Sequence, residues 1–303
     1  MLAPLGRRLA KVTANRVSGG YRIFTALDRE GPPPRAGQFY MLASARCWAS
    51  GGERPYLARA FSVADAEAEP GGVRLDFLVQ AIGPGTERLA ELDVGEDLWV
   101  IGPLGRPFSL PAEVRPGAAG AILVGGGIGI APLAIWRRQL AEAGVPARVL
   151  LGFRDRAHAG GHELFASERE APQGEGVAGQ DDSGPSAKLK LCPEIRLASE
   201  DGHAGHRGYV TDLLSVLLQG DDAATAAVYA CGPPAMLEAV RTMCDERGIG
   251  AELAMESPMA CGFGACMGCA IPLAGGGYMR LCVDGPVVEA SRIETAVVPG
   301  SGH

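Results

Sequence analysis

The sequence predicts a multi-domain β plus α/β protein, and three observations support this prediction. Short stretches of alternating apolar and polar residues fill roughly the first third of the chain, strands alternate with helices after Gly117, and half of the eight cysteines crowd near the C-terminus. A length of 303 residues suits about two domains with a small appendage. We expect domains at 1–112 and 113–255, a cysteine-rich module at 256–290 and a tail at 291–303.

Composition and charge exclude several classes of protein. The net charge is −7, and no basic run exceeds two residues, so nucleic-acid binding is not supported. The first 17 residues lack the apolar core of a signal peptide, which favours a cytoplasmic protein. Residues 117–136 carry no charge, but their six glycines and Pro132 are better explained by a buried strand, a tight turn and a helix start than by a membrane span.

The first domain is expected to be an antiparallel barrel or sandwich. Val73 to Gln80 places Val73, Leu75, Phe77 and Val79 on one face. Turn clusters rich in glycine and proline separate such stretches, as in small all-β domains. The other expected elements are strands at 21–27, 37–42, 59–64 and 97–102 and a helical turn at 87–92.

The second domain is expected to be a doubly wound parallel sheet, because its strands alternate with helices. Thr211 or Asp212 is the expected cap of its middle helix. A polar loop, 172–188, interrupts the domain. The expected strands are 121–124, 148–153, 194–198, 227–230 and 250–255, and the expected helices are 132–143, 211–218 and 234–247.

Four cysteines form the strongest motif. Cys261, Cys266, Cys269 and Cys282 have the spacing C-x4-C-x2-C followed by a distant cysteine, which is typical of a plant-type [2Fe–2S] cluster. Glycines between them let the loop wrap closely and point N–H groups at the sulfurs. The fourth ligand is expected on a strand over 278–283.

A structural zinc site is the alternative for these cysteines. Zinc sites favour two C-x2-C pairs, and this segment has one, so the spacing favours iron and sulfide. Cys47, Cys192 and Cys244 lie apart from the motif and are expected to be small core or loop residues.

A glycine-rich turn follows the strand at 121–124 and opens a helix. Its residues Gly125, Gly126, Gly127 and Gly129 let a pyrophosphate approach the backbone and the helix N-terminus, although Pro132 replaces the third glycine of the usual pattern. A tight turn between strand and helix needs glycine too, so this segment alone leaves both interpretations open.

A second turn stands at the end of the strand at 227–230. It contains Cys231, Gly232 and Pro233, with Met236 in the helix that follows. Both turns should meet at the carboxyl edge of the sheet, where open α/β sheets bind ligands. Cys231 is then expected near a nicotinamide, and the alternative is a buried thiol.

In the first domain, three short motifs offer phosphate or flavin contacts. Arg59 to Ser62 supplies a cation and a hydroxyl, Gly83 to Thr86 is a turn running into a helix, and Gly102 to Gly105 leads out of the domain. Each could also be an ordinary turn or surface residue.

Taken together, these motifs resemble the ferredoxin-reductase-like flavoproteins, which join an FAD-binding β-barrel to an NAD(P)-binding α/β domain. The cysteine segment, with HRGYVTDLL at 206–214, is most similar to the electron-transfer subunits of NAD-dependent dihydroorotate dehydrogenase. The resemblance extends over about residues 10–290.

The resemblance implies the cofactors and the residues that bind them. FAD would contact Arg59, Ala60, Phe61, Ser62, Leu78, Val79, Gln80, Gly85 and Thr86. NAD would contact Gly125, Gly126, Gly127, Gly129, Pro132, Cys231, Gly232, Pro233 and Met236. Cys261, Cys266, Cys269 and Cys282 would ligate the [2Fe–2S] cluster. The family usually has Tyr and Arg where Val79 and Gln80 stand, and proline where Ala60 stands.

The resemblance also implies a division of labour. An FMN-bearing catalytic subunit oxidises dihydroorotate for pyrimidine biosynthesis, and its electrons reach NAD⁺ through [2Fe–2S] and FAD in this chain, in a heterotetramer. No catalytic acid or base is then needed here. The alternative within the fold is an NAD(P)H-dependent ferredoxin or sulfur/polysulfide reductase. Arg154 and Arg156 leave NADH and NADPH both open, because they could receive a 2′-phosphate.

Overall fold

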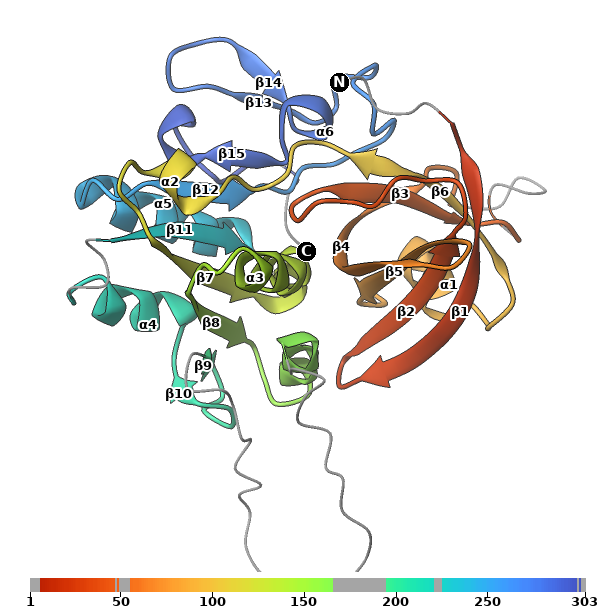
Figure 1. Cartoon of the computed structure of the whole chain (residues 1–303), viewed down its shortest axis with the longest axis horizontal. Coiled ribbons are helices and arrows are strands. Elements are labelled where there is room, and N and C mark those ends of the chain that lie inside the picture. The colour runs from red at the N-terminus through yellow and green to blue at the C-terminus, as the bar shows by residue number, and fades with distance from the viewer. Residues whose placement is uncertain are drawn as a thin grey trace, which may run out of the picture.

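The computed structural model describes residues 6–46, 48, 55–165, 195–220, 225–298 and 300. The expected loop at 172–188 and Cys47 and Cys192 lie outside these residues. In Figure 1 a β-barrel stands beside an α/β sheet, and a smaller module that contains β13, β14 and α6 caps both. This arrangement confirms the predicted fold class.

The barrel is closed and antiparallel, with strand order β1-β2-β5-β4-β3-β6. The pairing of β1 with β6 closes the barrel. The sequence analysis missed this pairing because it did not predict strand β1. Most residues of β1 are exposed or half-buried, which hides its alternation. The elements are β1 (Arg8–Ser18), β2 (Tyr21–Asp28), β3 (Phe39–Ser44), β4 (Arg59–Glu69), β5 (Gly72–Val79), α1 (Pro84–Ala90) and β6 (Asp97–Leu104).

A seven-stranded sheet forms the second domain, with order β10-β9-β8-β7-β11-β12-β15. Six of these strands pair in parallel, and β15 adds an antiparallel edge. The elements are α2 (Pro111–Val114), β7 (Gly120–Gly126), η1 (Gly127–Ile130), α3 (Ala131–Glu142), β8 (Ala147–Phe153), η2 (His158–Phe165), β9 (Ile195–Ser199), β10 (His206–Arg207), α4 (Val210–Leu217), β11 (Ala226–Cys231), α5 (Pro234–Glu246) and β12 (Ala251–Ala254).

Helices cover the two faces of this sheet, as a doubly wound fold requires. A Cβ on Gly125 would lie 3.2 Å from Leu133 of α3, and a Cβ on Gly152 would lie 2.8 Å from Val210 of α4. Gly126 pairs with Gly152, so Gly125 and Gly152 face opposite sides. The charge-free segment 117–136 is therefore β7, η1 and the start of α3. Among the described residues, no helix is long and apolar enough to cross a membrane.

The helices differ from expectation at several points. The first helix, α1, spans Pro84–Ala90 rather than 87–92. The cap of α4 is Tyr209, not Thr211 or Asp212. The Asp212 carboxylate reaches back and accepts the Tyr209 N–H at 2.8 Å, so it serves the first turn from inside the helix. A 3₁₀ turn, η1, also separates β7 from α3, where the sequence predicted a direct turn.

The C-terminal module joins both larger domains. It contains β13 (Ala270–Pro272), β14 (Tyr278–Arg280), α6 (Leu281–Asp284), β15 (Val287–Glu289) and η5 (Ala290–Arg292). The expected strand over 278–283 is wrong beyond Arg280, because α6 begins at Leu281. The Asp284 carboxylate accepts the Arg280 N–H at 3.1 Å and favours this helical turn. Ile293 and Ala296, in the expected tail, are buried.

Two of the contacts between the barrel and the sheet domain lie at α3 and at the connection after β6. Helix α3 lies between them in Figure 1, and its Arg138 pairs with Asp65 of β4 at 2.7 Å. Ser109, in the connection after β6, is held by Glu252 of β12, which accepts its N–H at 2.9 Å and its hydroxyl at 2.8 Å. The Tyr229 hydroxyl donates to the Ser109 carbonyl at 2.8 Å. These contacts hold the two walls of the cleft described next.

Candidate functional site

A cavity of about 390 Å³ opens where the barrel, the sheet and the C-terminal module meet. Barrel residues Arg59 to Ser62, Leu78, Gln80 and Thr86 line one side. Gly129, Pro132 and Cys231 line the other. Residues predicted from separate motifs to bind a flavin and a nicotinamide thus share one cavity, as hydride exchange between two cofactors requires.

The barrel side presents a cation beside a close backbone approach. A Cβ on Gly85 would lie 2.8 Å from Nε of Arg59, so a side chain there would push this guanidinium aside. Nη1 of Arg59 donates to the Leu57 carbonyl at 2.7 Å. The Thr86 hydroxyl accepts the N–H groups of Ile82 and Gly83 at 3.0 and 3.1 Å, so it holds the turn before α1.

Successive side chains at the end of β5 and just after it face different sides. Leu78 and Gln80 line the cavity, whereas Val79 is fully buried in the barrel core. Nε2 of Gln80 lies 3.1 Å from Nε2 of His158 in the second domain. Gln80 thus reaches across the cleft, which its family position did not suggest.

His158 is fixed by its own domain. Its Nδ1 lies 2.7 Å from the Asp155 carboxylate, and this hydrogen bond is the main cause that lowers the pKa of Asp155 to about 2. Arg154 contacts the same two side chains, at 3.3 Å from Asp155 and 3.2 Å from His158. The backbone N–H of Arg156 donates to Asp201. Arg154 is therefore already engaged within the protein at the edge where the sequence suggested a phosphate contact.

The two glycine turns of the sheet pack directly on each other. Gly125 pairs with Cys231 across β7 and β11, so both turns lie at the carboxyl edge, as predicted. A Cβ on Gly129 would lie 2.5 Å from the Gly232 Cα. A Cβ on Gly126 would lie 2.6 Å from Sδ of Met236. Both glycines therefore allow a close approach between the turns, in addition to any ligand.

The predicted nucleotide residues occupy different depths. Gly129, Pro132 and Cys231 reach the cavity, and the wall formed by the described residues does not include the others, namely Gly125, Gly126, Gly127, Gly232, Pro233 and Met236. Burial raises the pKa of Cys231 well above its ordinary value, and Glu256 adds to the effect, so the thiol stays neutral.

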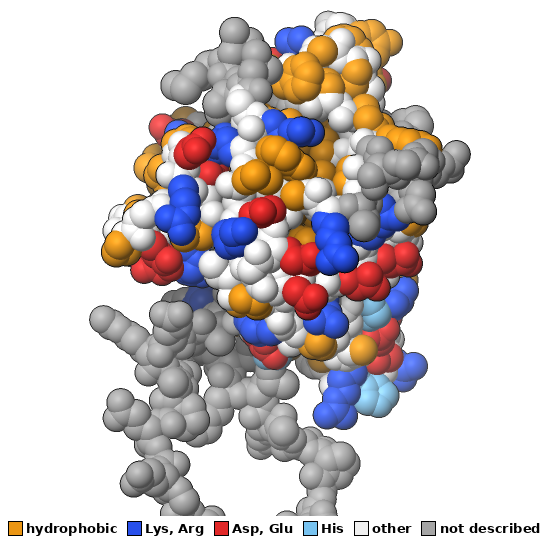
Figure 2. All heavy atoms as spheres, turned by 90° about the vertical axis from the view of Figure 1, so that its right-hand side faces the viewer, with side chains coloured by type: hydrophobic (Ala, Val, Ile, Leu, Met, Phe, Trp, Pro, Cys, Tyr) orange, Lys and Arg blue, Asp and Glu red, His pale blue; other side chains and the backbone are white. Residues whose placement is uncertain are grey.

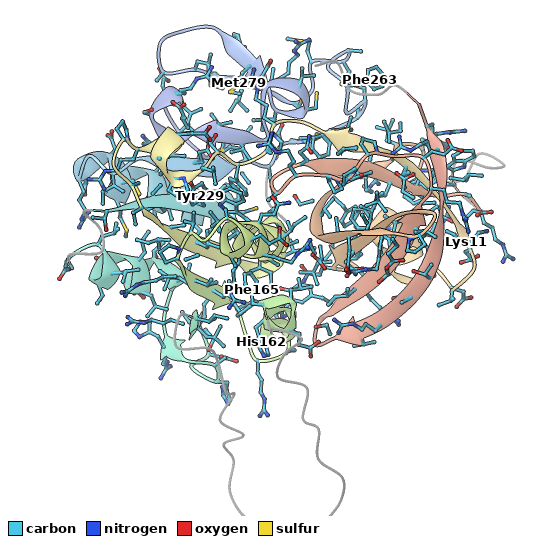
Figure 3. All side chains as sticks on the ribbon, viewed as in Figure 1. Lys11, His162, Phe165, Tyr229, Phe263 and Met279 are labelled. Carbon is cyan, nitrogen blue, oxygen red and sulfur yellow. The ribbon has the colours of Figure 1, made fainter. Side chains whose placement is uncertain are left out.

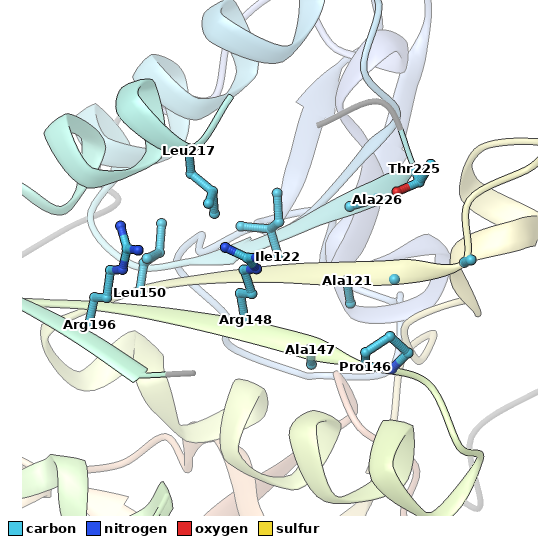
Figure 4. Close-up of a pocket in the computed structure, with 12 residues that line it drawn as sticks. Ala121, Ile122, Pro146, Ala147, Arg148, Leu150, Arg196, Leu217, Thr225 and Ala226 are labelled. Carbon is cyan, nitrogen blue, oxygen red and sulfur yellow. The ribbon is translucent and has the colours of Figure 1, made fainter. Parts of the chain in front are cut away.

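A second hollow, of about 440 Å³, lies at the opposite edge of the sheet. Gly120, Ala147 and Ala226, the first residues of β7, β8 and β11, line it. Arg148 and Arg196 point from neighbouring strands to the same side as Leu217 of α4 (Figure 4). Open α/β sheets bind ligands beyond the carboxyl ends of their strands, so the cavity beside Cys231 is the nucleotide candidate.

The four motif cysteines lie together in the C-terminal module, and all are free thiols. Sγ of Cys269 and Sγ of Cys282 are 3.2 Å apart, and both side chains are buried. Cys266 is exposed and Cys261 half-buried. Within the described part of the chain, no three His, Cys, Asp or Glu side chains are grouped as ligands of one metal ion.

Backbone N–H groups face two of these sulfurs, those of Cys261 and Cys282. Burial raises the pKa of Cys261, but hydrogen bonds from the N–H groups of Cys266, Phe263 and Ala265 outweigh it and bring the pKa to about 6. Burial and the nearby Cys269 raise the pKa of Cys282, while the Gly264 N–H opposes them. Three free thiols on one loop and a fourth in α6, with loop N–H groups facing Cys261 and Cys282, suit a [2Fe–2S] centre.

Sequence reasoning missed part of the cavity wall. Phe39 of β3 and the segment Met255–Met259 also line it. The signal for this segment is its place directly between β12 and the first cysteine. Cys244 is buried, as expected for a core cysteine.

The comparisons with known proteins agree with this geometry. Residues 256–294 match the family model for the iron–sulfur cluster binding domain of dihydroorotate dehydrogenase B. The chain is 30% identical over 287 residues to the dihydroorotate dehydrogenase B (NAD(+)) electron transfer subunit of Caldanaerobacter subterraneus subsp. tengcongensis, covering 94% of this chain and 97% of that protein. Its counterpart in Clostridium acetobutylicum is 32% identical over 259 residues, with 86% of each chain covered.

The chain belongs to this family of electron transfer subunits. It is an oxidoreductase subunit, which confirms the resemblance stated from the motifs. A solved NADH-dependent reduced ferredoxin-NADP oxidoreductase, studied for flavin-based electron bifurcation, matches with a TM-score of 0.71 at 22% identity. The match covers 96% of this chain and 91% of that one and shows the ferredoxin-reductase-like fold.

Proposed function

We propose that this chain carries electrons between NAD⁺ and the FMN of a separate catalytic subunit that oxidises dihydroorotate to orotate. FAD would occupy the cavity, and [2Fe–2S] would bind the four cysteines. One observation carries the proposal: Met255–Met259 lines the cavity and continues within two residues to Cys261. A flavin site and a cluster site are thereby neighbours along the chain and in space.

Each side of the cavity would hold one of the two cofactors, and the barrel side would hold FAD. Arg59, Ala60, Phe61, Ser62, Leu78, Gln80 and Thr86 would hold FAD, with Val79 and Gly85 supporting them. Arg59 supplies the positive charge that a flavin phosphate or ring edge favours. When bound, FAD supplies the conversion between two-electron hydride exchange and one-electron transfer.

The sheet side would hold NAD. The N-terminus of α3, with Ala131 and Pro132 at the cavity, favours a pyrophosphate through the helix dipole. Gly125, Gly126 and Gly129 let the segments around this turn pack closely, a Cβ on Gly127 would meet nothing closer than 3.9 Å, and Gly232, Pro233 and Met236 support the opposite turn. Cys231, neutral and at the cavity wall, would lie beside the nicotinamide.

The cluster module would face the catalytic subunit. Phe263 and Met267 are 40% and 54% exposed on the loop that carries Cys261 and Cys266. Phe263 lies at the outer edge of the module beside α6 (Figure 3). Apolar side chains gather at this end of the molecule, while charges of both signs mix below (Figure 2). An exposed apolar rim around a redox centre fits a protein interface, here in a cytoplasmic heterotetramer.

Anaerobic co-purification with the FMN-bearing subunit, followed by an orotate/NADH assay, tests the proposal. We expect the isolated chain to reduce artificial acceptors with NADH and to leave dihydroorotate unoxidised, and the complex to oxidise it with NAD⁺. Phe263→Glu should weaken this coupling several-fold and spare the artificial-acceptor activity. Val94→Glu, at an exposed apolar residue of the barrel, is the matched control.

Two outcomes would contradict the proposal. Dihydroorotate oxidation by the isolated chain would refute the division of labour between subunits. If no FMN-bearing catalytic subunit binds the chain, the alternative function, an NAD(P)H-dependent ferredoxin or sulfur/polysulfide reductase, would be favoured instead.

A further inference from the structure

Strand β3 is shared by two buried regions of the molecule. Tyr40 and Leu42 belong to the barrel core, whereas Phe39 and Met41 belong to the buried cluster that includes Cys269 and Cys282. This alternation follows from the strand, in which successive side chains face opposite sides. The outer face of β3 is therefore part of the iron–sulfur module's packing.

The two outward residues of β3 reach different sites. Phe39 lines the cavity assigned to FAD. Met41 is 1% exposed and lies against Gly262, the residue that follows Cys261. A Cβ on Gly262 would lie 2.5 Å from Cγ and 2.9 Å from Sδ of Met41. One strand thus touches the flavin cavity and the cysteine loop two residues apart.

Glycine is required at this contact for two reasons. Gly262 has a φ of +76°, which L side chains rarely adopt, and the Met41 side chain leaves no room for a Cβ. Leu104 of β6 also contacts this position, since a Cβ on Gly262 would lie 3.4 Å from its side chain. The barrel therefore supports the loop directly at its first cysteine.

Further supports of the loop come from its own module. The Gly264 carbonyl accepts a hydrogen bond from Nη1 of Arg280 at 3.0 Å. A Cβ on Gly264 would lie 2.7 Å from Val283 of α6. These contacts lie within the module, whereas the contacts of Met41 and Leu104 with Gly262 join the cysteine loop to the barrel.

We propose that Met41 is a positioning residue that sets the separation between the flavin cavity and the cysteine loop. The proposal rests on the proposed function. Electron transfer slows steeply as the distance between two centres grows. Loss of the Met41 contact should therefore slow electron transfer between flavin and cluster while all four cysteines remain in place. A thioether suits this role, because methionine fills irregular gaps between packed surfaces.

The test compares three variants of the full chain with both cofactors bound. Met41→Ala removes the seat, Met41→Leu keeps most of its volume, and Leu42→Ala removes a buried side chain of the same strand that faces the barrel core. Hydrogen exchange of amides 259–268 reports the seating of the loop. Stopped-flow mixing with NADH separates two steps: NADH is oxidised as FAD gains two electrons, and one of these electrons passes to [2Fe–2S].

We expect Met41→Ala to keep its iron and FAD content. Amide hydrogen exchange over 259–268 should become faster and cluster reduction several-fold slower, while flavin reduction stays unchanged. Met41→Leu should restore both measurements, and Leu42→Ala should move neither. Wild-type exchange and cluster reduction in Met41→Ala would overturn the proposal. A wild-type chain that binds no iron and sulfide would overturn the proposed function instead.

Discussion

The cysteine loop and the interdomain cavity are built in opposite ways. All four thiols come from residues 261–282, and the loop's own N–H groups face the sulfurs. The cavity instead draws on β3, β4, β5, α1, η1, α3, β11 and the segment Met255–Met259. A local site should lose its ligand through one substitution and leave the rest of the molecule intact. A distributed site depends on how whole domains are held.

The largest effect that this difference predicts is at the cysteine loop. Anaerobically purified protein should contain about two iron and two sulfide per chain. Cys266→Ser should lose most of this iron, because its thiolate is a proposed ligand, and should keep FAD, because Cys266 lies outside the cavity. Metal and sulfide analysis with flavin absorbance measures both.

Cys244→Ala is the matched control, since Cys244 is a buried thiol of α5 outside the motif. It should retain iron and sulfide. Finding one zinc and no sulfide in the wild type would sink the assignment of the four cysteines to iron.

The same contrast explains how much the sequence could predict. The four cysteines could be proposed as cluster ligands because spacing along the chain is visible in a sequence. The cavity residues Arg59, Cys231 and Gly129 were found from separate motifs, and the rule that ligands bind at the carboxyl edge of the sheet brought the last two together.

The parts that the sequence did not reveal depend on three-dimensional packing. Phe39 joins the cavity through a strand whose outer face is covered by another module. The helix at Cys282 depends on Asp284 folding back to Arg280. Strand β1 carries few buried residues, because one of its faces is solvated, and so its period was obscured.

A smaller effect is expected at the cavity. Arg59→Ala should weaken FAD binding, because the guanidinium beside Gly85 is a cation at the cavity wall. Gel filtration followed by flavin absorbance should show loss of FAD, and the iron and sulfide content should stay near that of the wild type.

Arg46→Ala is the control for a lost barrel charge, because this side chain is 82% exposed. It should keep FAD fully. Retention of full flavin by Arg59→Ala would show that the other wall residues suffice and that the assignment of Arg59 is wrong.

The smallest effect concerns how the two walls of the cavity are joined. Burial raises the pKa of Glu252 above its ordinary 4.5, although the N–H and hydroxyl of Ser109 oppose this, and Glu289 and Glu113 add to the rise. When a carboxyl group has a higher pKa in the folded chain than in the unfolded chain, the folded chain becomes less stable as the pH rises from the unfolded pKa through the folded pKa. The free energy of unfolding should therefore fall over this window.

Glu252→Gln should remove this pH dependence. Its amide can accept the Ser109 N–H and donate to the Ser109 hydroxyl, so both contacts to the linker survive without a buried charge. Thermal unfolding from pH 5 to 8 should show the variant gaining on the wild type as the pH rises, with FAD and iron contents equal. A parallel pH profile for the two proteins would mean that the pKa of Glu252 is the same in the folded and the unfolded chain, so that its burial would not make stability depend on pH.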